Sequence, residues 1–252
     1  MKKMIIGDDI VKSFGEGGEQ HNVLDGVSAY IHDGEFVAVM GPSGSGKSTL
    51  LFALSGTDGV NGGKVVFEGK DLSTLGENEL ADMRRTKMGF VFQQPTMLKN
   101  LNILDNIILP SMRDNRKNAA NISVKARELM KRVGIAELEK RSITQVSGGQ
   151  LQRAGICRAL MNNPSIIFGD EPTGALNSIS AQETMDIFSE INADGTAVML
   201  VTHDAQVAAR TERIMFMRDG KIVGELKLPK FGGTDMDGRV KKVMVKMQEI
   251  GI

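Results

Sequence analysis

Apolar residues fall into short runs separated by stretches of mixed polarity. Four runs are apolar on both faces rather than at alternate positions, which is typical of strands buried in a parallel sheet; they lie at 36–41, 88–93, 165–171 and 196–204. Amphipathic stretches with helical spacing lie after or between them, at 47–55, 77–87, 122–133, 149–162 and 180–192. This alternation predicts an α/β fold with a mainly parallel core sheet covered by helices.

The pattern differs at the start of the chain. The runs there are shorter and interrupted by turn residues, at 4–12, 22–31 and 64–68, and NGGKVVFEGK carries glycines of the kind that close hairpins. We expect a small antiparallel β subdomain beside the parallel sheet.

Two later changes in the sequence pattern indicate a subdomain and a C-terminal segment. The strand pattern is missing between Asn100 and Asn163 and helical patterns dominate, which predicts an α-helical subdomain. After Leu228 the segment PKFGGTDMDG breaks the order, and a short amphipathic helix is expected at about 238–249.

Composition narrows the class of protein. The 31 basic and 31 acidic residues cancel, so the chain lacks the positive excess expected of a nucleic-acid binder. Cys157 is the single cysteine, which excludes a disulfide within the chain, and we expect it to be a small buried apolar residue. Apolar runs stay short of the roughly 20 residues that span a bilayer, and the first run is too short for a signal peptide. We expect a cytoplasmic chain.

The segment GPSGSGKST fits the phosphate-binding pattern G-x-x-x-x-G-K-[ST], and it lies between a buried strand and a helix, as that motif requires. Lys47 can reach the β and γ phosphates and Ser48 can ligate Mg²⁺. A chance match is the alternative, expected in roughly one per cent of chains this long. The sequence predicts a phosphate cradle made by Gly41, Ser43, Gly44, Ser45, Gly46, Lys47, Ser48 and Thr49.

Two acids follow the apolar run SIIF. Asp170 lies where a parallel strand ends, at the sheet edge at which ligands bind, and is predicted to hold Mg²⁺. Glu171 is predicted to polarise the attacking water as general base. The alternative is that one carboxylate caps the following helix. Together with the cradle, these acids indicate a nucleoside triphosphatase.

The segment VSGGQLQRAGICRAL, about twenty residues before the acidic strand, resembles the signature motif of the ATP-binding-cassette (ABC) ATPases. The family pattern is LSGGQ, and Val146 here replaces the leucine. The resemblance implies ATP and Mg²⁺ as ligands and a P-loop ABC cassette over residues 1–228. In such a cassette the helical subdomain, about 95–163, is inserted in a RecA-like core, which leaves 229–252 as an extension.

The same resemblance implies a second copy. In the family the signature faces the phosphate cradle of a partner, so that two chains sandwich two ATP molecules head to tail. The residues expected to act on the partner's γ phosphate are Ser147, Gly148, Gly149 and Gln150. The alternative is a flexible loop in which Ser147 caps a helix.

Further family positions match one by one. Gln93 resembles the glutamine that touches Mg²⁺ and the attacking water, and His203 the histidine at the γ phosphate; both join Glu171 and Lys47 as catalytic candidates. Phe14 occupies the place of the aromatic ring that stacks on adenine, with simple core packing as the alternative. Asn177 departs from the pattern, since GALNS stands where the family has GALDS, which puts communication between the two sites in doubt.

The resemblance also implies a membrane partner. A single cassette requires an integral membrane permease on a separate chain, which would hold this one at the inner face of the cell membrane. Residues 94–112 are expected to receive a short permease helix, through the apolar Met97, Leu98, Leu101 and Ile103 or, alternatively, to pack these within the helical subdomain.

Several functions stay open within the family. GFVFQQPTMLKNLNILDNIILP and DEPTGAL are similar to the ATPases of lipoprotein-release, macrolide-efflux and bacitracin-type peptide-resistance permeases, and the tail after Leu228 favours the last. The alternatives are an ATPase that signals to a membrane protein without transport, and a soluble ATPase acting on DNA or the ribosome.

Overall fold

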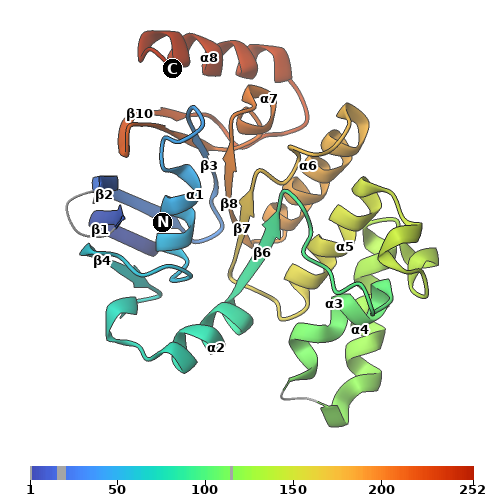
Figure 1. The fold of residues 1–252 in the computed structure, drawn as a ribbon. Coiled ribbons are helices and arrows are strands. Elements are labelled where there is room, and N and C mark those ends of the chain that lie inside the picture. The colour runs from blue at the N-terminus through green and yellow to red at the C-terminus, as the bar shows by residue number, and fades with distance from the viewer. Residues whose placement is uncertain (1, 16–20, 114–115) are drawn as a thin grey trace.

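The computed structural model describes residues 2–15, 21–113 and 116–252, which form two sheets surrounded by helices (Figure 1). The larger sheet has the strand order β10-β9-β3-β8-β7-β6. Its neighbours are parallel except β10, which runs antiparallel to β9. The strands are β3 (Phe36–Met40), β6 (Met88–Phe92), β7 (Ile166–Asp170), β8 (Ala197–Thr202), β9 (Arg213–Arg218) and β10 (Lys221–Lys227).

The smaller sheet is antiparallel and has the order β2-β1-β4-β5. It comprises β1 (Lys3–Phe14), β2 (His21–His32), β4 (Gly62–Phe67) and β5 (Lys70–Asp71). Gly63 lies in the left-handed region at φ 74°, and a Cβ there would approach the Asp9 carbonyl oxygen to 2.2 Å. Only glycine fits where β4 crosses β1 so closely.

The helices divide between these sheets and a separate helical layer, at the right of Figure 1. They are α1 (Lys47–Leu54), α2 (Glu77–Lys87), α3 (Ile103–Met112), α4 (Ala119–Arg132), α5 (Gly148–Leu160), α6 (Ser178–Ala193), α7 (Ala205–Ala208) and α8 (Met236–Glu249). Short 3-10 turns lie at Leu72–Thr74, Arg116–Asn118, Ala136–Leu138 and Ile143–Gln145. Within the described ranges, we find no helix with the length and apolarity that crossing a membrane demands.

Three clusters of buried apolar side chains hold these layers together. The first joins the two sheets around α1 and contains Leu50, Leu54 and Phe67. The second joins the far face of the large sheet to the helical layer, where α4 contributes Ile122 and Met130 at helical spacing. The third lies under α8. Burial of these side chains is the main stabilising contribution to the fold.

A buried ion pair also links the sheets. Arg213 on β9 donates to both carboxylate oxygens of Glu35, from Nε at 2.6 Å and from Nη2 at 2.9 Å. The same guanidinium donates to the Tyr30 carbonyl at 2.5 Å and lies 4.4 Å from the Tyr30 ring centroid. Burial acts to raise the pKa of Glu35, but the hydrogen bonds from Arg213 and from the His32 amide outweigh it and lower that pKa.

The predicted α/β fold and its buried strands are confirmed. Cys157 is buried, as predicted, and burial raises the pKa of its thiol to about 12. The expected final helix is present as α8. The elements that were not predicted include α3, which contains Pro110, the single-turn helix α7, and the strands β9 and β10.

Candidate functional site

The phosphate-cradle segment forms the turn between β3 and α1. Gly46 is the N-cap of α1 in a left-handed conformation at φ 95°, and Gly44 has φ 80°. A Cβ on Gly41 would approach the Met217 carbonyl oxygen to 2.1 Å. These glycines therefore let the backbone curl more tightly than other residues allow, so that its N–H groups can converge on an anion.

Two polar side chains of this turn are buried with few partners. Ser45 Oγ has no hydrogen-bond partner among the described residues. Lys47 is buried as well, and within the described part of the chain its Nζ donates only to the Pro42 carbonyl, at 2.9 Å. Burial lowers the pKa of Lys47, while Glu171 and Asp170 act to raise it. An unpaired hydroxyl and a desolvated ammonium fit a phosphate in this cradle.

The first acid after β7 meets the cradle. Ser48 Oγ donates to Asp170 Oδ1 at 2.8 Å. Burial raises the pKa of Asp170, although the Ser48 hydrogen bond acts to lower it. A hydroxyl and a carboxylate side by side are the hard oxygen ligands that Mg²⁺ prefers, so the predicted pair fits this ion.

The second acid, Glu171, is held in an unusual backbone conformation. Its φ is 47°, in the left-handed region that residues other than glycine rarely adopt. Two backbone bonds fix it, from its N–H to the Val201 carbonyl at 3.0 Å and from the Gly174 N–H to its own carbonyl at 2.9 Å. Its carboxylate faces the loop that holds His203.

Three predicted catalytic side chains converge at this point. His203 Nδ1 lies 2.8 Å from Glu171 Oε2. A Cβ placed on Gly174 would lie 2.9 Å from Gln93 Nε2 and 3.3 Å from Glu171 Oε2, so both side chains border Gly174. An imidazole thus contacts the Glu171 carboxylate, and the Gln93 amide lies beside the same carboxylate at Gly174.

Gln152 is a site residue that the sequence analysis missed. It is fully buried on α5, and its Nε2 donates to the Phe92 carbonyl at 3.0 Å and to the Pro172 carbonyl at 2.7 Å. These carbonyls belong to the direct neighbours of Gln93 and Glu171. Its only signal in the sequence is its place two residues after SGGQ, which does not reveal burial.

The signature segment starts α5. Ser147 is the N-cap: its Oγ accepts from the Gln150 N–H at 3.2 Å, and Gln150 Oε1 accepts from the Ser147 N–H at 2.9 Å. The alternative that Ser147 caps a helix is therefore confirmed, but Gly148 and Gly149 lie in the first turn of α5 and not in a flexible loop. Ser147 and Gly148 are exposed, so a second molecule can still reach them. The helix α1 packs in the apolar cluster between the two sheets, and α5 packs in the cluster on the far face of the large sheet, so the cradle and the signature of one chain lie on opposite faces of that sheet.

Comparison with known proteins decides the family. The family model for ABC transporters matches residues 24–174, a span that holds the cradle, the signature and both acids. The chain belongs to the ABC transporter family.

Two relatives show how far the ABC likeness extends. The chain is 41% identical over 206 residues to the lipoprotein-releasing system ATP-binding protein LolD of Aquifex aeolicus, covering 82% of this chain and 92% of LolD. It is also 41% identical over 217 residues to the macrolide export ATP-binding/permease protein MacB of Pasteurella multocida, covering 86% of this chain and 33% of MacB. The chain therefore spans about a third of the length of MacB.

Solved ABC cassettes share the fold. The dimeric structure of MJ0796, a bacterial ABC transporter cassette, has a TM-score of 0.82 and 38% identity, covering 90% of this chain and 100% of that chain. A post-hydrolysis dimer of MJ0796 bound to ADP and Pi has a TM-score of 0.77, with the same identity and coverage. The predicted family, fold class and ATPase activity are confirmed.

Two other predicted positions in this ABC ATPase can now be placed. Phe14 ends β1 and is 43% exposed, so the core-packing alternative is wrong. Phe14 pairs with His21, at the start of the strand β2 whose Val23 carbonyl adjoins Gly46. Asn177 is the N-cap of α6, and its side chain accepts from the Ser180 N–H at 2.9 Å.

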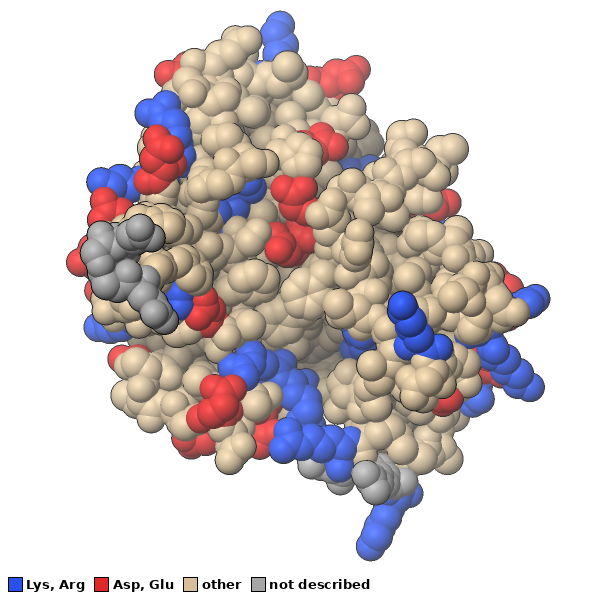
Figure 2. Space-filling view, viewed as in Figure 1, with Lys and Arg blue, Asp and Glu red and all other residues tan. Residues whose placement is uncertain are grey.

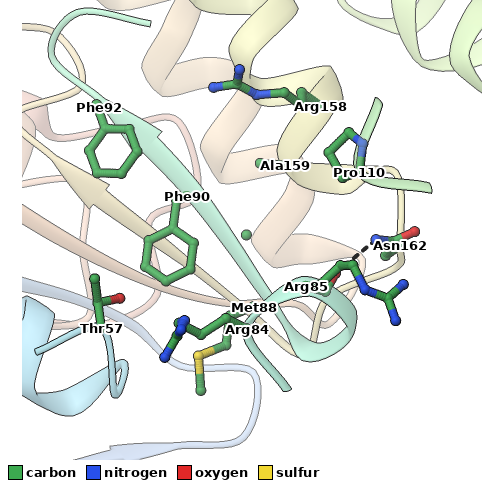
Figure 3. A pocket seen from close by; sticks show the side chains of 11 residues that line it. Thr57, Arg84, Arg85, Met88, Phe90, Phe92, Pro110, Arg158, Ala159 and Asn162 are labelled. Atoms are coloured by element: carbon green, nitrogen blue, oxygen red, sulfur yellow. Dashed lines mark hydrogen bonds between the residues drawn. The ribbon is translucent and has the colours of Figure 1, made fainter. Parts of the chain in front are cut away.

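A cavity of about 430 Å³ opens between α2, β6, and the ends of α3 and α5. Phe90 and Phe92 project into it from β6, while Pro110 and Arg158 lie across from them (Figure 3). In Figure 2 the corresponding hollow beside α2 is bordered by basic side chains. An apolar floor with a basic rim suits a short helix of another protein.

Of the segment 94–112 that is predicted to receive a permease helix, Pro110 lines this cavity. None of Met97, Leu98, Leu101 and Ile103 lines it. Met97 and Ile103 are buried in the core of the helical layer, and Leu98 is exposed. The reason is Asn106, whose buried amide bonds Leu98 N–H at 2.7 Å and the carbonyls of Leu98, Leu101 and Asn102, which pins the loop against α3.

Proposed function

We propose that this ABC ATPase binds Mg²⁺-ATP, pairs head to tail with a second copy, and drives a separate membrane permease. The observation that carries the proposal is that His203 and Gln93 both lie close to Glu171, beside a cradle in which the buried Ser45 hydroxyl has no partner among the described residues. In this arrangement a carboxylate can act on a water directly in front of bound phosphate.

The residues divide the chemistry between them. Lys47 and the backbone N–H groups of the cradle bind phosphate charge. Ser48, Asp170 and Gln93 are the residues that would hold Mg²⁺, which supplies charge neutralisation on the phosphoryl group when bound. Glu171 orients the attacking water and takes its proton. His203, bonded to one oxygen of Glu171, fixes the direction of that carboxylate.

The position of the signature favours the head-to-tail pair. Ser147 and Gly148 are exposed at the start of α5, where the helix dipole favours an anion. The cradle of the same chain lies on the opposite face of the large sheet. A second copy is therefore the natural source of the phosphate that this helix start would bind, and ring stacking on Phe14 would hold the base.

The cavity beside α2 is the proposed permease contact. It adjoins Phe92, the residue before Gln93, so a helix seated there would press directly on the strand end that leads into the site. ATP binding and permease binding would then both shift the conformation of the end of β6. Through this contact the chain would be held at the inner face of the membrane.

For the cargo, we propose antimicrobial-peptide export of the bacitracin-resistance type, supported by the tail after Leu228. The second candidate is lipoprotein release or macrolide efflux, which the 41% identity to LolD and MacB favours. A labelled peptide, lipoprotein or macrolide offered to the reconstituted complex in sealed vesicles separates these. ATP hydrolysis stimulated by the permease without movement of any of them would indicate a signalling role instead.

The test of the hydrolytic mechanism is Glu171→Gln. We expect kcat to fall about 10²- to 10⁴-fold with ATP affinity retained and a dimer trapped in ATP, measured by phosphate release, nucleotide binding and light scattering. Lys47→Ala is expected to weaken nucleotide binding itself.

The matched control for Glu171→Gln is Glu128→Gln, the same chemical change at an exposed position of α4. It should leave all three measurements unchanged. Turnover near the wild-type rate in Glu171→Gln would remove the general base from the mechanism.

A further inference from the structure

The segment after β10 is attached to the body of the protein by a buried arginine. Arg239 on α8 is 5% exposed and donates three hydrogen bonds to backbone carbonyls: Nε to Ala209 at 2.5 Å, Nη1 to Pro229 at 2.8 Å and Nη2 to Thr211 at 2.9 Å. Five N–H donors in a rigid fork suit an arginine to several fixed acceptors at once.

Two of these acceptors directly follow the short helix after His203. The helix α7 has a single turn, starts at the cap Asp204 next to His203, and has Ala209 as its C-cap. The carbonyls at 205, 207 and 208 accept from backbone N–H groups at 209–211, and Arg239 bonds the next carbonyls, those of Ala209 and Thr211. One turn of helix is unstable by itself, so α8 helps to hold the C-terminal end of α7, while His203 stands directly before its start.

An aromatic ring continues the attachment to α6. The guanidinium groups of Arg210 and Arg239 each lie 5.3 Å from the Phe231 ring centroid, and Arg210 pairs with Asp186 on α6. Cation–π contacts of this kind are stronger when the cation is desolvated, and both arginines are buried. The tail thus bridges α6 and α7 through two arginines and one ring.

The tail also shares a cavity with the catalytic candidates. A space of about 530 Å³ is lined by Glu171 and His203 at one end and by Phe231, Gly233 and Met236 at the other. A shift of the tail therefore changes the walls of the space into which His203 projects.

We propose that Arg239, supported by Phe231, is a positioning residue that holds α7 and so keeps His203 against Glu171. The tail after β10 then acts as a fixed support for the histidine rather than as an appendage of the cassette. This inference rests on the proposed role of Glu171 and His203 in hydrolysis, and it adds a residue outside the segment matched by the ABC family model.

The test is Arg239→Gln in the full chain. We expect kcat for ATP to fall about 10- to 100-fold with KM nearly unchanged, because a small misplacement of a catalytic group costs rate rather than affinity. Hydrogen exchange of the amides at 205–209 should accelerate. Arg239→Lys keeps the charge but loses the fork, and it should recover part of the rate.

A double-mutant cycle separates positioning from general destabilisation. In a His203→Ala background, Arg239→Gln should cause little further loss of kcat, because the group it positions is already missing. An equal fold-loss with and without His203 would overturn the proposal. So would a kcat within about twofold of wild type in Arg239→Gln while α7 exchanges faster.

Arg218→Gln is the matched control. Arg218 also donates to backbone carbonyls of the tail, at Ile250 and Gly251, but it holds the opposite end of α8. It should lower the unfolding temperature slightly and leave kcat unchanged; a loss of kcat like that of Arg239→Gln would show that α8 acts only as general support.

If Arg239→Gln does not fold, Phe231→Leu keeps an apolar side chain while removing both cation–π contacts. It should lower kcat severalfold in the wild-type background alone, and an unchanged kcat would reject the proposal. Absence of ATPase activity in the wild-type chain with its permease would instead reject the proposed function.

Discussion

Gln152 is fully buried, and only the nitrogen of its side-chain amide is hydrogen-bonded to residues that the structure describes. Its Nε2 bonds two carbonyls, whereas its Oε1 has no partner among the described residues. An unmet buried acceptor costs about 1–3 kcal/mol. Since an apolar core residue would avoid that cost, the amide is best understood through what it joins, the backbone before Gln93 and the backbone after Glu171.

Gln152→Leu is expected to lower kcat for ATP about 10- to 100-fold with smaller change in nucleotide affinity, because both catalytic loops lose their shared donor. It should also reduce the free energy of unfolding by about 1–3 kcal/mol, since two buried carbonyls lose their partner. Steady-state kinetics and urea denaturation measure the two effects.

Gln248→Leu, the same change at an exposed position of α8, serves as control and should alter neither quantity. If Gln152→Leu lowered stability and left kcat intact, the amide would be part of the core and nothing more.

A single residue could be predicted where a local sequence pattern marks it. The cradle, Asp170 and Glu171 lie at fixed spacing beside apolar runs, so their placement followed from the pattern. Gln152, Arg213 and Arg239 are polar residues buried by partners distant in the sequence. No local pattern signals such burial, because the cost of burying a polar side chain is offset by hydrogen bonds to residues that are distant in the sequence.

Between neighbouring elements, the Arg213–Glu35 pair shows how one buried contact ties two sheets together. Its guanidinium is bidentate to the carboxylate, which is the strong geometry for such pairs. Glu225 on β10 adds a third contact, at 3.3 Å. Removing one partner leaves a buried charge unpaired, so the two residues should depend strongly on each other.

Arg213→Met should reduce the free energy of unfolding at pH 7 by about 3–5 kcal/mol, and Arg213→Met with Glu35→Leu should recover most of the loss. Because the pair lowers the folded pKa of Glu35, its contribution is present above the unfolded value, 4.5, and is lost as pH falls through the folded one. Denaturation midpoints of wild type and Arg213→Met should therefore converge on acidification. A gap that stays constant below pH 4 would contradict this account.

The same pair explains why β9 escaped prediction. The strand RIMFMR starts with an arginine that a polarity pattern places outside, whereas the structure buries it. The strand β10 escaped prediction because only part of each of its faces is covered. The helix α3 escaped it because it contains a proline, a residue that usually ends helices. In each case tertiary contacts, rather than local pattern, decide the element.

For the molecule as a whole, the coupling of hydrolysis to a membrane partner depends on the cavity beside α2. Pro110→Arg places a long cation in a space whose lining contains Arg84, Arg85 and Arg158 and, among the residues that the structure describes, no carboxylate. It should leave the ATPase rate of the isolated chain unchanged and abolish stimulation by the permease, because a seated helix would have to bury an unpaired charge.

The adjacent Leu109→Arg is the matched control. Leu109 is 46% exposed and does not line the cavity, so stimulation should persist. The two rates are measured with and without permease in vesicles. Full stimulation of Pro110→Arg would move the permease contact elsewhere on the surface.

The separation of cradle and signature on opposite sides of the large sheet has a genetic consequence. In the proposed pair, a copy that carries Lys47→Ala has lost its cradle but still presents an intact signature to its partner. A copy that carries Gly148→Asp has lost its signature but still has an intact cradle. Neither allele alone supports activity. Expressed together, they assemble mixed pairs with one whole chamber in each, so two inactivating lesions at these positions should complement each other.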